Sequence, residues 1–139
     1  MNGSLKANSQ TYINGVLIKI LVYGNNKFSD YDTFTRAVVV AIDNAIDNQD
    51  GRLDIYTAGP YKINQFAAEF VNKTEGFFKQ KGIKSRFYRV LKNDVVGNFD
   101  KYDLDSVVYL STKNDRSEIF DVVISEAESN NIPVNIYKV

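Results

Sequence analysis

The chain has 139 residues, with 17 basic and 17 acidic side chains, and it contains neither cysteine nor histidine. Without these two residue types, disulfides, thiol nucleophiles, Ser-His-Asp hydrolysis and Cys- or His-ligated metal sites are all excluded. The even charge balance argues against binding nucleic acid through the bulk charge of the protein, although a local patch stays open. No run of about 18 apolar residues is present, and the polar arm over 1–15 lacks the apolar stretch of a signal peptide, so we expect a cytoplasmic protein.

The first half of the chain alternates between strand and helix patterns. Residues 16–23 form an almost continuous apolar, β-branched run, which is typical of a strand buried on both faces. Apolar residues then recur at steps of three and four over 31–48, which predicts a helix with Asp30 as its N-cap. Residues 53–57 predict a second strand, and 63–81 predict a second helix.

The second half continues this alternation with one interruption. Residues 85–90 predict a third strand, in which Arg86 and Arg89 indicate an edge or a position facing a site. Residues 91–103 are polar and predict a loop. The last elements are a strand, a helix and a short strand over 106–110, 117–130 and 134–137.

Strands that alternate with long helices favour a mostly parallel sheet covered on both faces. The sequence therefore predicts an α/β fold: a three-layer, Rossmann-like domain with about five strands and helices on both faces. Residues 16–139 are expected to form this single domain, since the length suits one domain, after the polar arm over 1–15.

In such a sheet, ligands bind beyond the carboxyl ends of the strands, where the strand order reverses. The site is therefore expected in the turns after the strands, provided that the first and fourth strands are neighbours. These turns are rich in glycine, amides, hydroxyls and cations, and some lead into helix N-termini, which favour anions. The candidate ligand-binding residues are Gly24, Asn25, Asn26, Lys27, Asp30, Gly59, Lys62, Asn64, Arg89, Ser111, Thr112, Lys113, Arg116 and Ser117.

Each of these turns also has an ordinary structural explanation. They can be polar strand-to-helix connections with solvated cations, and Asp115 with Glu118 has the spacing of a capping box. Neither GxGxxG nor GxxxxGK[ST] occurs, which argues against a dinucleotide fingerprint or a P-loop. Asp100 and the acidic residues of 103–105 fit a solvated surface better than a cation site, so we predict no metal and no resident cofactor.

Taken in order, these segments resemble the SLOG superfamily of nucleotide-binding Rossmann-like domains, and within it the YspA-like proteins, which are related to DprA and the Lonely Guy enzymes. The matching segments are Gly24–Asp30, Thr57–Ala67 and the closing Asn131–Val134. The resemblance covers roughly Ile18–Val139 and implies a nucleotide-like ligand, self-association into a homo-oligomer, and a setting in bacterial or phage conflict systems. The richness in Asn, Lys, Ile and Tyr fits an AT-rich, phage-like genome.

The chain departs from the family pattern where catalysis would need it. Asn26 stands in place of the family's arginine, Lys62 in place of a later glycine, and Asn64 in place of its acidic residue. A pocket that keeps the family's position but lacks the family's acidic residue indicates binding rather than catalysis. We therefore predict that the protein binds a nucleotide or a nucleotide-derived signal without catalysis.

Two alternatives stay open. The chain could be an enzyme acting on an N-glycosidic or phosphate bond, with Glu118, Asp30 or Asp115 as acid or base. It could instead be a protein-interaction or inhibitor module, because a Rossmann-like scaffold does not fix function.

Overall fold

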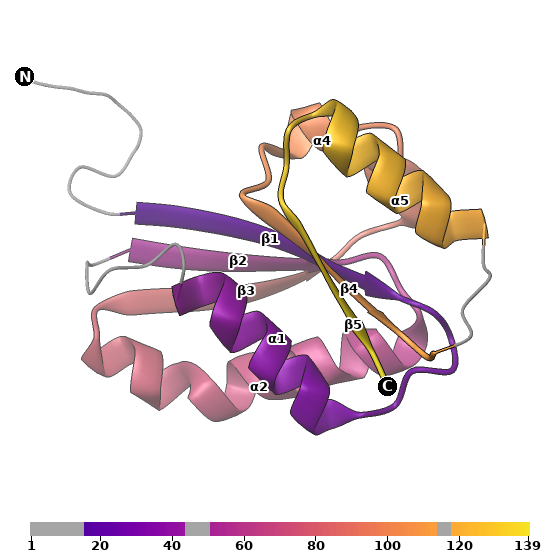
Figure 1. Cartoon of the computed structure of the whole chain (residues 1–139). Coiled ribbons are helices and arrows are strands. Elements are labelled where there is room, and N and C mark those ends of the chain that lie inside the picture. Colours follow the sequence, from indigo (N-terminus) through magenta and orange to yellow (C-terminus); the bar gives the residue numbers. More distant parts are fainter. Residues whose placement is uncertain (1–15, 44–50, 114–117) are drawn as a thin grey trace, which may run out of the picture.

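The computed structural model describes residues 16–43, 51–113 and 118–139. Within them, five strands form one parallel sheet in the order β3-β2-β1-β4-β5 (Figure 1), which confirms the predicted α/β, Rossmann-like fold. The strands are β1 (Val16–Gly24), β2 (Gly51–Thr57), β3 (Ile83–Arg89), β4 (Ser106–Ser111) and β5 (Val134–Lys138). The helices are α1 (Tyr31–Asp43), α2 (Tyr61–Gln80), α3 (Lys92–Val95), α4 (Phe99–Tyr102) and α5 (Glu118–Ser129).

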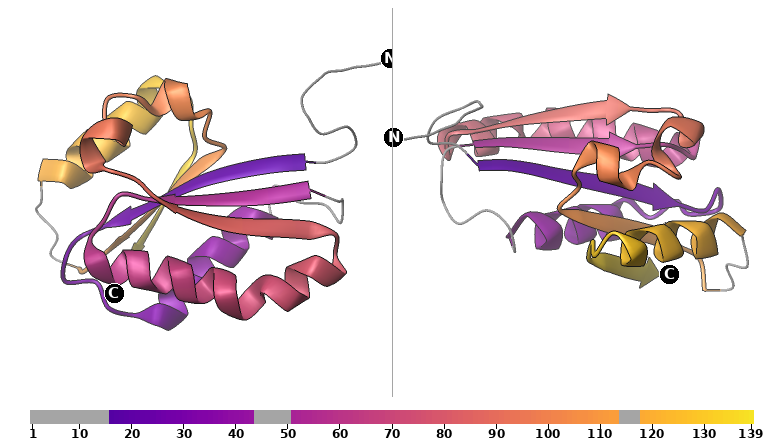
Figure 2. Two further views of the ribbon diagram at one scale, coloured as in Figure 1. Left: turned by 180° about the vertical axis from the view of Figure 1, so that it is seen from behind. Right: turned by 90° about the horizontal axis from the view of Figure 1, so that it is seen from above.

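The central strand β1 is apolar because both of its faces are covered. Ile20 and Val22 pack on one face with α1 and α2, while Leu21 and Tyr23 pack on the other with α5. All four side chains are at most 5% exposed. Figures 1 and 2 show the long helices α1 and α2 together on one side of the sheet, and α5 with the short helices α3 and α4 on the other.

The strand order reverses between β1 and β4, as the expected site requires. The chain first moves outward from β1 to β2 and β3, then returns to the other side of β1 as β4 and continues to β5. β1 is paired in parallel with β2 on one side and with β4 on the other. The turns that follow β1 and β4 therefore leave the sheet side by side.

Gly24, at the end of β1, lies against the backbone of β4. A Cβ atom at this position would overlap the carbonyl oxygen of Leu110 in β4 and the side chain of Ile63 in α2. The backbone N–H of Asn25 donates to that same carbonyl oxygen at 3.1 Å. A residue without a side chain is therefore needed at the end of β1.

The prediction of a loop over 91–103 was wrong, because this connection contains α3 and α4. Val95 and Phe99 are almost fully buried against the face of the sheet that α5 covers. The carboxylate of Glu126, in α5, accepts hydrogen bonds from the backbone N–H groups of Gly97 at 2.6 Å and Phe99 at 3.0 Å. These long-range contacts hold two single helical turns that the local polar pattern does not indicate.

Other boundaries agree with the sequence to within a few residues. β3 lies at an edge of the sheet, which confirms the edge position indicated by Arg86 and Arg89. The first helix is described as far as Asp43, and its predicted continuation lies outside the described residues, as does the arm over 1–15. None of the helices in the described ranges is both long and apolar enough to cross a lipid bilayer.

Replacing Gly24 with alanine is expected to destabilise the protein, because the added methyl group must displace the backbone of Leu110. We expect the free energy of unfolding to fall by about 1–3 kcal/mol. Gly76→Ala is the matched control: Gly76 is exposed within α2, with no atom within 4 Å of an added Cβ. That substitution should raise the free energy of unfolding by about 0.5–1 kcal/mol. Urea denaturation measures both, and an unchanged midpoint for Gly24→Ala would contradict the close approach.

Candidate functional site

The turns after β1 and β4 are joined by side chains as well as by the backbone. The amide Nδ2 of Asn25 donates to the hydroxyl of Thr112 at 2.9 Å. The Oδ1 atom of Asn25 also accepts a hydrogen bond from the backbone N–H of Lys27 at 3.3 Å. Asn25 thus holds its own turn in shape and fastens it to the end of β4.

The N-terminus of α1 is occupied by a group of the protein itself. Asp30 accepts hydrogen bonds from the backbone N–H of Thr33 at 3.1 Å and from the hydroxyl of Thr33 at 3.0 Å. These two bonds lower the pKa of Asp30. The predicted N-cap role is confirmed, and the carboxylate takes the position that a bound anion would occupy at this helix end.

The N-terminus of α2 has no such cap. Its N-cap residue is Pro60, which supplies no side-chain hydrogen bond to the helix. The preceding Gly59 has a φ angle of 107°, in the left-handed region that suits glycine, and no atom lies within 4 Å of a Cβ placed there. Asn64, in the first turn, accepts a hydrogen bond from the hydroxyl of Thr57 instead. This helix end therefore presents backbone N–H groups that no side-chain cap satisfies.

An open crevice of about 320 Å³ lies at the carboxyl ends of β1 and β2. Its walls come from both strand ends, from the start of α3 and from the first turn of α5. The lining residues are Tyr23, Gly24, Asn25, Asn26, Ala58, Gly59, Pro60, Lys92 and Ile119. We call this cavity the strand-end crevice.

An aromatic stack supports the crevice from the β1 side. Tyr23 is 5% exposed and its ring is stacked on that of Tyr109, with the centroids 6.2 Å apart. Tyr109 in turn meets the ring of Phe120 edge-on at 4.9 Å. Burial raises the pKa of Tyr23, so its hydroxyl keeps its proton at neutral pH. The stack fixes the ring of Tyr23 as an aromatic part of the crevice wall.

The structure brings together only some of the residues predicted from the sequence. Gly24, Asn25, Asn26 and Gly59 line the crevice, and Thr112 contacts it through Asn25. Several predicted residues lie outside the lining formed by the described residues: Lys27, Asp30, Lys62, Asn64, Arg89, Ser111 and Lys113. Two more, Arg116 and Ser117, lie outside the described residues.

The predicted residues outside the lining differ in what they do. The four cations among them are exposed, and Arg89 ends the outer strand β3, which β2 separates from β1. Ser111 is fully buried, and its hydroxyl donates to the carbonyl oxygen of Thr112 at 3.0 Å. Ser111 and Asn64 therefore hold the turns in place rather than face the crevice.

The sequence analysis missed Tyr23, Ala58, Pro60, Lys92 and Ile119 as lining residues. A signal for Lys92 was present, because it follows the third strand within three residues and so lies at the same edge of the sheet. Its charge makes the lining cationic, since the lining contributed by the described residues holds one lysine and no carboxylate. Among the described residues, no cluster of three metal-ligating side chains is arranged to hold a metal ion.

No protein-family model matches the chain, and no curated protein matches it. Among solved structures, it is similar to the universal stress protein from Archaeoglobus fulgidus, with a TM-score of 0.51 and 17% identity over 86% of this chain and 93% of that one. A structure of the universal stress protein from Archaeoglobus fulgidus in complex with dAMP gives a TM-score of 0.47 and 15% identity, over 86% and 96% of the two chains. At these identities the likeness shows the fold alone. Universal stress proteins are a Rossmann-like family different from SLOG, so the SLOG resemblance stays a prediction.

The cap at α1 gives a pH-dependent prediction. Because the folded state lowers the pKa of Asp30, its contribution to stability is full above the unfolded pKa of about 3.9 and is lost as the pH falls through the lower folded value. Asp30→Ala should therefore lower the melting temperature at about pH 6, and the difference from the wild type should shrink below about pH 4.

Asp30→Asn is the control, because asparagine keeps a cap acceptor but does not titrate. Its melting temperature should stay closer to that of the wild type at about pH 6. A gap between the wild type and Asp30→Ala that stays constant down to about pH 2 would contradict the role of the ionised cap.

Proposed function

We propose that the strand-end crevice binds a nucleotide or a nucleotide-derived small molecule. The observation that carries this proposal is that the Gly59–Pro60 turn, which leads into the uncapped N-terminus of α2, lines the same crevice as Lys92 and the amides of Asn25 and Asn26. Free N–H groups at a helix start together with a lysine form a favourable environment for phosphate.

The two halves of such a ligand match the two kinds of wall. A phosphate would lie at the Gly59–Pro60 turn, where the open space above Gly59 lets an anion approach the backbone. A base would lie toward Ile119 and the stacked ring of Tyr23, which offer apolar surface. The side chain of Asn26 is exposed and bears both donors and an acceptor for the sugar or the base edge.

The size and chemistry of the crevice favour binding over turnover. A volume of about 320 Å³ is at the lower end of the range for small-molecule sites, which suits a mononucleotide. Hydrolysis of a glycosidic bond uses paired carboxylates, and the lining formed by the described residues holds none. Asp30 accepts from Thr33 in its cap, and Glu118 is exposed outside the lining.

The SLOG resemblance supports the same location, because it also assigns the ligand to the turns after the strands. A cytoplasmic, self-associating accessory protein of a phage or a bacterial conflict system is the biological setting that belongs to this proposal. The similarity to a universal stress protein structure supports only the fold that creates the crevice.

Isothermal titration calorimetry with AMP, ADP, ATP and cyclic nucleotides tests the proposal. At least one of them should bind, and Lys92→Gln should weaken its binding about three- to tenfold through the loss of a charge-assisted hydrogen bond. The matched control is Lys101→Gln, since Lys101 is an exposed lysine on α4, in the same connection, and does not line the crevice. Absence of heat across the whole panel, or equal losses in the two variants, would refute the proposed site.

A further inference from the structure

One face of the sheet is only partly covered by helices. α5 packs over β1 and β4, and α4 reaches Tyr56 near the carboxyl end of β2. The amino-terminal halves of β1, β2 and β3 have no described helix over this face, as Figures 1 and 2 show. Strands of parallel sheets are usually apolar on both faces because helices cover both. β1, β2 and β3 carry polar and charged side chains in these halves, on the face that no described helix covers, which we call the bare face.

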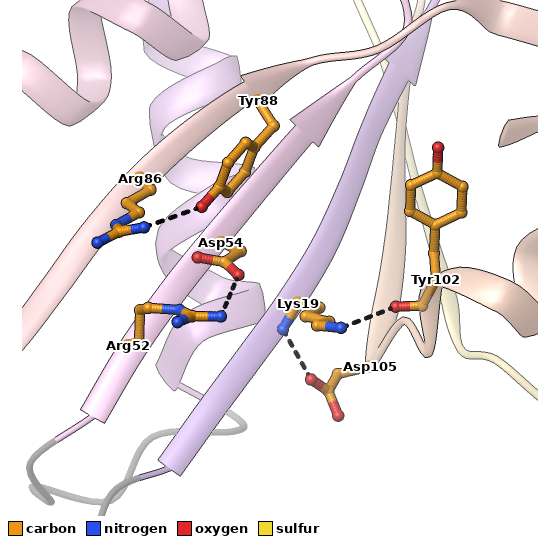
Figure 3. Close-up of polar contacts among 7 residues, drawn as sticks. All are labelled: Lys19, Arg52, Asp54, Arg86, Tyr88, Tyr102 and Asp105. Atoms are coloured by element: carbon orange, nitrogen blue, oxygen red, sulfur yellow. Dashed lines mark hydrogen bonds and ion pairs between the residues drawn. The ribbon is translucent and has the colours of Figure 1, made fainter. Parts of the chain in front are cut away.

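Cations dominate the bare face. Lys19, Asp54 and Arg86 lie in one row across three neighbouring strands, and Arg52 and Lys84 are paired in the next row. Figure 3 shows Asp54 with Arg52 beside it, their ion pair being 3.1 Å long. Asp54 is 1% exposed, and its second oxygen has no hydrogen-bond partner. The five side chains carry four positive charges and one negative charge, in a chain whose overall formal charge is zero.

Tyrosine rings continue the face toward the carboxyl ends of the strands. Tyr56 and Tyr88 are paired across β2 and β3, and their rings are stacked with centroids 5.2 Å apart. Tyr102 from α4 meets Tyr56 edge-on at 5.4 Å. The guanidinium of Arg86 donates to the hydroxyl of Tyr88 at 3.3 Å (Figure 3). Planar cations and aromatic rings are therefore joined in one surface, which we call the cationic–aromatic face.

We propose that the cationic–aromatic face binds single-stranded nucleic acid. Arg52, Lys84 and Arg86 would contact phosphates, and Tyr88 with Tyr56 would provide the aromatic surface for a base. Sheet surfaces that combine aromatic rings with cations are a recurrent solution for recognising single strands. An acidic peptide would satisfy the cations but would leave the tyrosine rings without a role. Three strands at about 4.8 Å spacing form a platform about 10 Å wide, which fits one nucleic-acid strand.

The test uses the full chain and a fluorescein-labelled oligothymidylate of about ten nucleotides, followed by fluorescence anisotropy. We expect a dissociation constant of about 10⁻⁴ to 10⁻⁶ M at about 50 mM salt. Three phosphate contacts predict a slope of about −2 for log K against log salt, hence a loss of about 15- to 20-fold at about 200 mM. Lys84→Gln with Arg86→Gln should reduce that slope to about −0.7. Tyr88→Leu should weaken binding about tenfold.

Matched controls lie on α2, over the opposite face of the sheet. Lys79→Gln removes an exposed lysine, and Phe77→Leu removes an exposed ring that lies under the ammonium group of Lys81 at 5.3 Å. Both variants should bind the oligonucleotide as the wild type does, and an excess of AMP should not compete.

Three results would overturn the proposal. The first is that the oligonucleotide does not bind at low salt. The second is that the face variants and the control variants lose affinity for it equally. The third is that AMP competes with the oligonucleotide while the face variants keep full affinity. The third would place the oligonucleotide in the strand-end crevice. A face that fails this test but captures an acidic peptide, with the same dependence on Lys84 and Arg86, would also reject nucleic acid as its occupant. The first two results do not depend on whether free nucleotides bind in the strand-end crevice, so they test the cationic–aromatic face separately from the proposed function.

Discussion

The contact between Gly24 and the carbonyl group of Leu110 is the constraint on which the strand-end crevice depends. It lets β1 and β4 end at the same level with no side chain between them, so the Asn25 N–H can bond to the β4 backbone. Only then can the side chain of Asn25 reach Thr112, which lies 87 positions further along the chain. Parallel pairing alone would bring the two strands together, but this close approach makes their turns one surface.

The main strands and helices were largely predictable, whereas the connection between β3 and β4 was not. The apolar run of β1 and the three- and four-residue spacing of α1 and α2 arise from burial against neighbouring layers, so the pattern in the sequence reports the layer directly. The helical turns of α3 and α4 have a different cause. Glu126 holds the junction between them, through bonds to Gly97, which lies 29 positions away, and to Phe99, which lies 27 positions away. A contact of that range leaves no trace in local periodicity.

The candidate site shows the same division on a smaller scale. The rule that ligands bind beyond strand ends selected turns that line the strand-end crevice, because the rule depends only on topology. It could not select the side chains, since their directions are set by hydrogen bonds within the turns. Asp30 turns to Thr33, and Asn64 accepts from Thr57, although both are polar residues at helix starts. Lys92 enters the crevice because α3 begins almost immediately after β3.

The connection through α3 and α4 also explains why the molecule presents two chemically different surfaces. A long helix in this position would cover the second face of β1–β3 and would demand apolar residues there. The two single helical turns of α3 and α4 leave this face uncovered by a helix, so Asp54 is buried only by neighbouring side chains. Burying a carboxylate destabilises the folded state unless cations pair with it. Arg52 supplies the ion pair to Asp54 at 3.1 Å, and Arg86 lies opposite Asp54 in β3. The ammonium group of Lys19, the partner of Asp54 in β1, donates to the carbonyl oxygen of Tyr102 at 3.3 Å. The segment from Lys92 to Tyr102 therefore begins at the strand-end crevice and ends at the cationic–aromatic face. Because it contains two single turns instead of a long helix, it contributes to the first surface and leaves the second uncovered.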